Sequence, residues 1–499
     1  MAEKQVNILT ESQASHSDDD NQDLIWLDAE EKALVRKIDL IVMSLLMLGF
    51  FALQLDRGNI GNALTDFLLR EVGITQYQFN TGQLLLSAGI VLLEIPSNLI
   101  LFKIGPALWI GSQIVTWQDM NPNPTPGLVA TLQAFIKGKG VGPYLATRLL
   151  LGLCEAGFIP AGLYAITRWY KRDETTKRFS WFFIGNMFAV ACSGLVAYGI
   201  LHMRGVCDLS GWQWLFLIEG MFTVIVGFAF ISLFPKAPGN PVSVFGYRYF
   251  NERESQILLR RVLLDDPSKA QTQQHISGAE IKAAVTNWKL IPHVILTLCA
   301  LAPSSTLFSY APTLVVSFGY DRLTSNAMVS IGAWILLATN ISWGIVADRW
   351  GRRGPLVAFG LLLLWGFTAC FSHCGNLSRI LGNQLLVESS NPKLRFALLT
   401  LSIAFGSNWH PVNGSWMALN CKSAGERSIT MAIFIMAANT SGIIGSQLFQ
   451  PTDAPLYKKG WTVILALETV ALVMAVVAIL QYYVLNRRQS RKGDGMYKH

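Results

Sequence analysis

The chain has 499 residues, of which 52% are hydrophobic and only 14% are charged. Because soluble domains usually have about 25% charged residues, this composition argues against a soluble protein. The formal net charge of +8 could indicate a nucleic-acid partner. However, apolar stretches long enough to cross a bilayer recur along the whole chain, and the basic residues gather on one side of them. We therefore expect a protein embedded in the lipid bilayer, with no nucleic-acid partner.

The N-terminal segment, residues 1–37, is expected to be a cytoplasmic tail. It begins with a polar, acidic stretch that lacks the apolar core of a cleavable signal peptide. Residues 26–35 have the spacing of a short amphipathic helix lying at the inner membrane surface. The first apolar segment must then serve as the insertion signal.

Apolar segments predict an all-α polytopic protein with twelve transmembrane helices in two six-helix halves, residues 38–234 and 290–485. A central cytoplasmic loop, 235–289, separates the halves and contains a predicted amphipathic helix over 252–264. A short cytoplasmic tail, 486–499, ends the chain. Two such halves with a site at their interface are a recurrent plan of transporters. The expected spans are 38–62, 79–101, 107–136, 143–166, 179–200, 213–234, 290–316, 327–347, 355–372, 395–418, 428–449 and 461–485.

The third span is interrupted. Two short apolar pieces, 107–117 and 127–136, are separated by residues 118–126, which contain three prolines. Proline removes a backbone donor and clashes with the preceding turn, so a helix cannot continue through this stretch. Without it the two pieces would join into one membrane-spanning length. We interpret residues 118–126 as an insertion or a gene-model artefact, and the alternative is a natural broken helix that lines a cavity.

Four charged residues lie inside predicted spans: Asp56, Arg57, Arg148 and Glu155. A charge at the centre of a spanning helix costs about 2.5–3.5 kcal/mol on insertion scales, so such residues usually pair, face water or act in function. Arg148 and Glu155 are two helical turns apart and share one face. Helix direction places Asp56, Arg57 and Arg148 at similar depth, with Glu155 nearer the midplane. This pattern favours a functional cluster for an anion and protons, and the alternative is a structural ion-pair network.

Two further acids, Glu94 and Glu219, are weaker candidates, because each lies near a predicted helix end where a cap or gate contact is as plausible as proton transfer. Polar residues in the second half could hydrogen-bond a substrate or allow close helix packing. The candidates are Tyr310, Asn413 and Asn439.

The turn between the eighth and ninth spans, residues 344–353, has the pattern G-x-x-x-D-R-x-G-R-R. Its acid and arginines can form a charge network with neighbouring helix ends and hold one face shut. The pattern resembles the signature loop of the major facilitator superfamily, although the equivalent turn of the first half, 98–106, has no Asp-Arg pair. The expected gating residues are Gly344, Asp348, Arg349, Gly351 and Arg352.

Beyond this loop, residues 25–490 resemble the anion:cation symporter branch of that superfamily, including its fungal allantoate-permease-like members. The segments that carry the resemblance are 55–63, 94–98, 148–157, 211–220 and 411–428. The resemblance implies a twelve-helix fold that opens alternately to each side. It also implies that Asp56 and Glu155 carry protons, and that Arg57 and Arg148 bind the anion.

The sequence therefore favours a proton-coupled importer of a small organic anion, a carboxylate or sulfonate, acting as a monomer in the plasma membrane with both termini cytoplasmic. Asn376 begins a glycosylation sequon in an outer loop, and Cys370 and Cys374 could be a disulfide or isolated thiols. No cofactor or metal is expected. An enzyme is not expected either, because the soluble segments contain no nucleophile elbow, phosphate loop or metal cluster. Export of a secondary metabolite, or a non-transporting sensor or inactive paralogue, are the alternatives.

Overall fold

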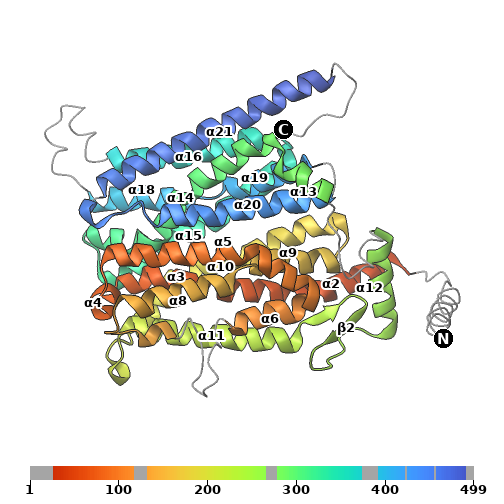
Figure 1. Cartoon of the computed structure of the whole chain (residues 1–499), viewed down its shortest axis with the longest axis horizontal. Helices are drawn as coiled ribbons and strands as arrows, with labels where there is room; N and C mark the ends of the chain where they lie inside the picture. Colours follow the sequence, from red (N-terminus) through yellow and green to blue (C-terminus); the bar gives the residue numbers. More distant parts are fainter. Residues whose placement is uncertain are drawn as a thin grey trace, which may run out of the picture.

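The computed structural model describes residues 26–116, 132–265, 278–373, 391–421, 424–454 and 457–490. Within these ranges the chain is almost wholly helical, and long helices lie side by side in two bundles (Figure 1). Among the described residues, eight helical segments are long and apolar enough to cross a membrane. The all-α membrane fold expected from the sequence is confirmed. Residues 118–126, Cys374 and Asn376 lie outside the described residues.

The first half begins with a helix that differs from its prediction. The helix α2 is continuous with the first spanning helix over Asp28–Leu64 and does not lie apart from it. The reason is local: a π-helical turn, η1, joins the two segments without leaving helical geometry. The elements of this half are α2 (Asp28–Ile38), η1 (Asp39–Met43), α3 (Ser44–Leu64), α4 (Leu68–Val72), α5 (Gln76–Ile104), α6 (Pro106–Thr116), η2 (Gln133–Phe135), α8 (Val141–Glu155), α9 (Phe158–Trp169), α10 (Arg172–Leu201), η3 (Val206–Asp208) and α11 (Gly211–Leu233).

The central connection contains a two-stranded antiparallel hairpin, β1 (Pro235–Ala237) and β2 (Asn240–Ser243), followed by α12 (Glu252–Asp265) and α13 (Gly278–Val285). The apolar face of α12 buries Ile257, Leu258 and Val262. The elements of the second half are η5 (Trp288–Leu290), α14 (Ile291–Ser317), α15 (Arg322–Trp350), α16 (Arg353–His373), α18 (Pro392–Ala404), α19 (Trp409–Leu419), α20 (Ala424–Gly445), η7 (Pro451–Asp453) and α21 (Lys458–Ser490).

The two halves meet along their lengths. Helix α5 packs against α20, α10 against α15, and α3 against α14. The start of α2 and the end of α21 lie at the same end of the molecule, on the right in Figure 1, which we call the terminal end. The other end, where α4 and α18 lie, is called the opposite end. The site described below lies between these two ends.

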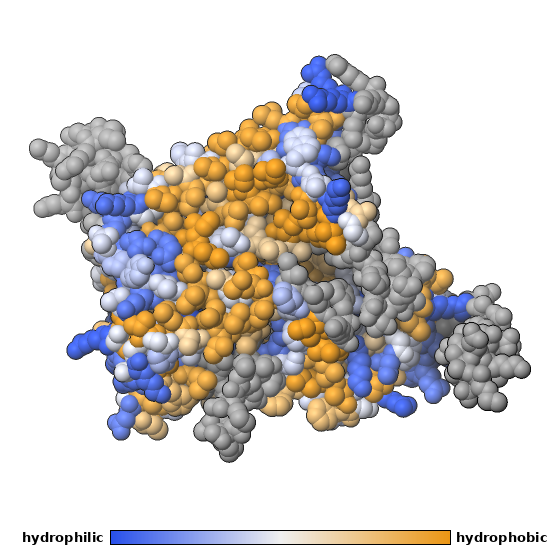
Figure 2. Space-filling view, in the orientation of Figure 1, coloured by the Kyte–Doolittle hydropathy of each residue, from blue (hydrophilic) through white to orange (hydrophobic). Residues whose placement is uncertain are grey.

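The surface has the pattern that a bilayer requires. Figure 2 shows apolar side chains across the middle of the helices, with hydrophilic residues toward both ends. Helix α21 exposes apolar residues of this kind, among them Val473, Val476 and Leu480. In water such a band would be unfavourable, but lipid tails solvate it.

Close packing of α5 on α8 sets the geometry of the charged cluster. At Gly152 an added Cβ would lie 2.1 Å from the backbone oxygen of Leu86. Only glycine therefore permits this approach, as in other membrane helix pairs that contact through small residues. The contact fixes the face of α8 that carries Arg148 and Glu155 against the first-half bundle.

Candidate substrate site

The centre of the candidate site is an ion pair between two helices of the first half. Nε of Arg57 on α3 lies 2.5 Å from Oε2 of Glu155, the last residue of α8. The Glu155 side chain is fully buried, whereas that of Arg57 is 18% exposed. A charge-assisted hydrogen bond of this kind offsets part of the cost of removing both charges from water. The structure therefore brings together two of the four charged residues found in the sequence.

Glu155 stands at a break in the fourth span. Ala156 is extended and Gly157 has a left-handed φ of 86°, so α8 stops and α9 begins three residues later. The side-chain amide of Gln113 on α6 donates to the backbone oxygen of Ala156 at 2.5 Å, which satisfies the exposed carbonyl. Non-helical backbone at membrane depth requires such a partner. The sequence predicts one continuous span over 143–166, and Gly157 followed by Pro160 is the signal for the break.

We expect Gly157→Ala to destabilise the fold. A Cβ at this position would lie 1.9 Å from Oγ of Ser97, and the left-handed φ adds strain, a cost of about 1–3 kcal/mol. The measurement is the thermal unfolding midpoint of the purified protein in detergent. Gly138→Ala is the matched control, because Gly138 also has a positive φ of 70° but nothing lies within 4 Å of its added Cβ. Equal midpoints for the two variants would contradict the role of the Ser97 contact.

Arg148 provides the second cation of the site. It is 1% exposed, and its guanidinium lies over the ring of Tyr144, 5.7 Å from the centroid. Its Nε and Nη2 atoms have no hydrogen-bond partner among the described residues. It interacts electrostatically with Glu155, as the predicted shared helix face requires. A buried guanidinium with free donors is suited to bind an anionic group.

The second half reaches this cluster through Asn439. Its side-chain amide on α20 donates to Oε2 of Glu94 on α5 at 2.9 Å. Glu94 is 4% exposed and is attracted by Arg57. Arg57 is thus flanked by two carboxyl groups, Glu155 and Glu94. Glu94 was only a weak candidate for proton transfer in the sequence. Its position between Arg57 and a residue of the other half depends on how the halves pack, which local sequence patterns do not show.

Asp56 faces away from this ion pair, although it precedes Arg57 in the chain. Consecutive helical residues point about 100° apart. Asp56 is 5% exposed and lies beside Thr223 on α11, and it also interacts electrostatically with Glu155. The four charged residues therefore form one electrostatic cluster, but Asp56 occupies a separate polar pocket.

Two other candidate residues lie apart from the charged cluster. Asn413 is buried between helices of the second half, where its Oδ1 lies 2.7 Å from Nδ1 of His293 and its Nδ2 donates to Thr297 at 3.2 Å. Tyr310 donates through its hydroxyl to Oδ1 of Asn80 at the opposite end of the bundle. Of the second-half candidates, the structure places Asn439 in contact with the cluster.

Hydrogen bonds and ion pairs between the halves gather at the opposite end. Asp66 is fully buried there and accepts hydrogen bonds from Arg322 of the second half and from Arg204. Nδ2 of Asn80 donates to the backbone oxygen of Phe449 at 2.8 Å. We call these contacts, with that of Tyr310, the opposite-end seal. The Asp66–Arg322 pair could not be predicted from local patterns, because its members lie 256 positions apart.

Glu71 lies beside the opposite-end seal and bonds to its residue Arg204. Burial acts to raise the pKa of Glu71, but hydrogen bonds from Ser210 and Trp212 and the Arg204 guanidinium hold it below the ordinary value. Glu71 therefore stays ionised at neutral and mildly acidic pH. Protonation of Glu71 is therefore not expected to open this end in that pH range.

Arg322→Ala should weaken the opposite-end seal. Loss of a hydrogen bond to a charged, buried partner costs about 1.5 kcal/mol or more, which corresponds to about a tenfold larger population with this end open. The measurement is the electron-spin distance distribution between labels on cysteines introduced at Arg70 and Lys393, with the native cysteines replaced. Lys459→Ala, which removes an exposed cation at the same end, is the control. An unchanged distribution in Arg322→Ala would contradict the seal.

The gating motif joins α15 to α16 at the terminal end. Helix α15 ends at Trp350, and Gly351 adopts a left-handed φ of 66° to turn the chain. Asp348 is 77% exposed and lies 3.4 Å from Nη2 of Arg353, within the same turn. Nε of Arg353 donates to Oγ of Ser415 on α19. In this conformation the acid of the motif is therefore turned to solvent, and its ion pair with Arg353 stays within the same turn.

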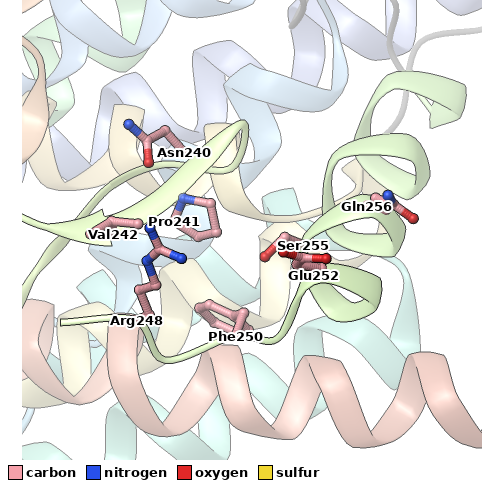
Figure 3. A pocket seen from close by; sticks show the side chains of 8 residues that line it. All are labelled: Asn240, Pro241, Val242, Arg248, Phe250, Glu252, Ser255 and Gln256. Atoms are coloured by element: carbon pink, nitrogen blue, oxygen red, sulfur yellow. The ribbon is translucent and has the colours of Figure 1, made fainter. Parts of the chain in front are cut away.

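A surface hollow lies elsewhere, in the central connection. It has a volume of about 340 Å³ and is formed by the hairpin and α12 of the central connection. Figure 3 shows Arg248 and Phe250 on one side of it and Ser255 and Glu252 on the other. It shares no residue with the charged cluster, so we assign it no part in the site.

The architecture and the buried charged cluster define a transporter of small molecules built from two helical halves. Residues 46–446 match the family model of the Major Facilitator Superfamily, and the chain belongs to this family. The general prediction from the signature loop is thereby confirmed. Membership makes the chain a multi-pass secondary transporter and not an enzyme.

Individual relatives agree with this assignment. The chain is 30% identical to an uncharacterized transporter of Saccharomyces cerevisiae, over 95% of this chain and 84% of the relative. It is 27% identical to the "Putative tartrate transporter" of Agrobacterium vitis, over 68% of this chain and 75% of the relative. Among solved structures, the fold is similar to that of a D-xylose-proton symporter, with a TM-score of 0.61, 14% identity and coverage of 87% and 96% of the two chains.

Proposed function

We propose that the chain is a proton-coupled symporter of a small organic anion, a carboxylate or sulfonate, from the anion:cation symporter branch of the family. The observation that carries this proposal is the arrangement of Arg57 and Arg148 around the buried carboxyl group of Glu155. Two guanidiniums attract an anion, and a carboxyl between them can lose one of its partners to that anion. In this proposal Arg57 and Arg148 bind the substrate, Asn439 contacts it from the second half, and Glu155 and Asp56 carry protons.

Charge balance gives the reason for coupling. With Glu155 and Glu94 ionised, their two negative charges cancel those of Arg57 and Arg148 even before Asp56 is counted, so no excess positive charge remains for a substrate. An anion that enters this poorly hydrated cluster adds an uncompensated charge, which is costly in a low-dielectric site. A proton on Glu155 removes one negative charge and frees Arg57 to bind the anion. Anion and proton then travel together.

We further propose that this conformation is the inward-facing state of an alternating-access cycle. In the proposal the terminal end is cytoplasmic, because short turns at this end are basic, above all the segment 168–178. The opposite-end seal is then the closed outer gate, and the exposed Asp348 belongs to an open inner face that its motif closes in the other state. We also propose that the protein is a monomer in the plasma membrane. Asn376 is the proposed glycosylation site.

The names of similar proteins also support this proposal. Tartrate is a small dicarboxylate, so the name of the Agrobacterium vitis relative agrees with an organic anion as substrate. The symporter with the similar fold is named for proton coupling, and its sugar substrate is uncharged at neutral pH, so it supports the mechanism of coupling and not the choice of anion.

The proposal is tested by uptake into proteoliposomes that contain the purified protein. Allantoate, nicotinate, pantothenate, tartrate and a simple sulfonate are offered at two external pH values, with and without a protonophore. We expect at least one anion to be taken up faster at the lower pH, with the protonophore removing its accumulation. Uptake of none of them, or uptake that ignores both pH and protonophore, would contradict the proposal.

A further inference from the structure

A second polar pocket lies between α3 and α11, beside the candidate substrate site. Asp56 and Asn59 project from one face of α3, three residues apart, and Glu219 and Thr223 project from one face of α11, four residues apart. All four side chains are at most 5% exposed. Buried polar groups of this kind are costly in a membrane protein and usually mark a functional site.

The four side chains are one another's neighbours. Thr223 lies next to Asp56, Asn59 lies next to Glu219, and the two carboxyl groups repel each other electrostatically. Even so, both oxygens of Asp56 and of Glu219, both amide atoms of Asn59 and the hydroxyl of Thr223 close no hydrogen bond among the described residues. Two buried carboxyl groups surrounded by unsatisfied amide and hydroxyl groups need a cation between them.

Among the described residues, no basic side chain supplies this cation. Arg57 turns to Glu155, and α11 carries no Lys or Arg between Gly211 and Leu233. The titratable side chains on the helices that pack against α3 within the membrane are Glu219 on α11, Cys192 and Tyr198 on α10, and His293, Cys299 and Tyr310 on α14. Glu155 is the further acid in electrostatic contact with Asp56.

We infer that Asp56 and Glu219 share one proton, which makes Glu219 a further residue of the coupling machinery. One carboxylate takes up the proton and becomes a hydroxyl donor to the other carboxylate, while Asn59 and Thr223 orient the pair. Two close carboxylates in a low-dielectric site behave in this way because they cannot both ionise. Asp56 connects this proton to the substrate site through Glu155. This inference rests on the proposed function, since the proton is the coupling ion of the symport.

The test compares Glu219→Gln, Asp56→Asn and the double variant in proteoliposomes with an anion that the wild-type protein carries. We expect each single variant to lose about tenfold or more of the accumulation driven by one pH unit. Exchange of labelled for unlabelled anion at equal pH should stay within about twofold of wild type, because exchange moves no net proton. The double variant should be no worse than either single variant, because both remove the same shared proton.

The matched control is Glu468→Gln. Glu468 on α21 is a carboxyl group of the second half that is 1% exposed and accepts a hydrogen bond from Thr368. Its neutralisation should leave accumulation unchanged. Wild-type accumulation in Glu219→Gln would overturn the inference. So would accumulation driven by a sodium gradient at equal pH that Glu219→Gln abolishes, because the pocket would then hold sodium.

Infrared difference spectroscopy separates this inference from the proposed function. Near neutral pH, the spectrum of wild type should contain a protonated-carboxyl band that is lost in both Glu219→Gln and Asp56→Asn and kept in Glu468→Gln. This band is read without transport, so it decides the shared proton even if no tested anion is carried. Retention of the band in either single variant of the pair would contradict proton sharing.

Discussion

Replacement of Arg148 by alanine should reduce anion uptake by at least about 30-fold, because removing one partner of a buried charged contact costs about 2–5 kcal/mol. The expected loss is this large because Arg148 is 1% exposed and its Nε and Nη2 have no hydrogen-bond partner among the described residues, so both donors are available to a substrate. Arg148→Lys should give an intermediate rate, since lysine keeps the charge but not the planar fork that matches a carboxylate. Initial uptake rates at saturating and limiting anion concentrations provide the measurement.

The control for this change is Arg70→Ala, which removes an exposed arginine of α4. Its uptake should equal that of wild type at every anion concentration. Undiminished uptake by Arg148→Ala, with normal amounts of folded protein, would show that Arg148 does not bind the anion. A purely structural role predicts a lower unfolding midpoint for Arg148→Ala, and an unchanged rate per folded molecule.

Replacement of Glu155 by glutamine should uncouple the anion from protons. Each pH unit supplies 1.36 kcal/mol per proton, or about tenfold accumulation, and a side chain that cannot release a proton cannot use this energy. Glutamine also cannot form the ion pair with Arg57, so the guanidinium remains available to the anion at all pH values. We therefore expect accumulation to fall to about the external concentration, while uptake becomes insensitive to pH.

Two readouts distinguish uncoupling from simple damage. Anion exchange at equal pH should persist in Glu155→Gln, because the anion-binding arginines are intact. Glu468→Gln again serves as the control for neutralising a buried carboxyl group. If Glu155→Gln retains wild-type accumulation across a pH gradient, Glu155 does not carry the coupled proton.

The spans were the part of the fold that the sequence predicted best, because long apolar stretches have few other structures available in a membrane. The predicted segment 461–485 lies within α21, and 213–234 coincides with α11 to within two residues at its start. Local features that depend on packing between helices could not be predicted as well. The break after Glu155 depends on Gln113 and Ser97, which come from other helices and fill the space that the turn leaves.

In the candidate site, too, the sequence predicted local relations within one helix but not contacts between helices. Seven-residue spacing predicts that Arg148 and Glu155 share a face of α8, and both interact with each other in the structure. Helical rotation sends Asp56 and Arg57 to different neighbours, which the sequence could not indicate without knowing what packs around α3. The Glu94–Asn439 contact joins residues 345 positions apart across the two halves. Such contacts depend on how the halves dock, and no local pattern encodes that.

In the proposed mechanism, one buried cluster both binds the anion and couples it to a proton. The most direct test of this mechanism is substrate-driven proton movement, measured with a pH dye trapped inside proteoliposomes that contain wild type or Arg148→Ala. We expect that adding a transported anion outside acidifies the lumen of wild-type vesicles, and that Arg148→Ala reduces this acidification as strongly as it reduces anion uptake. Anion uptake by wild type without any change in luminal pH would show that the anion moves without a proton.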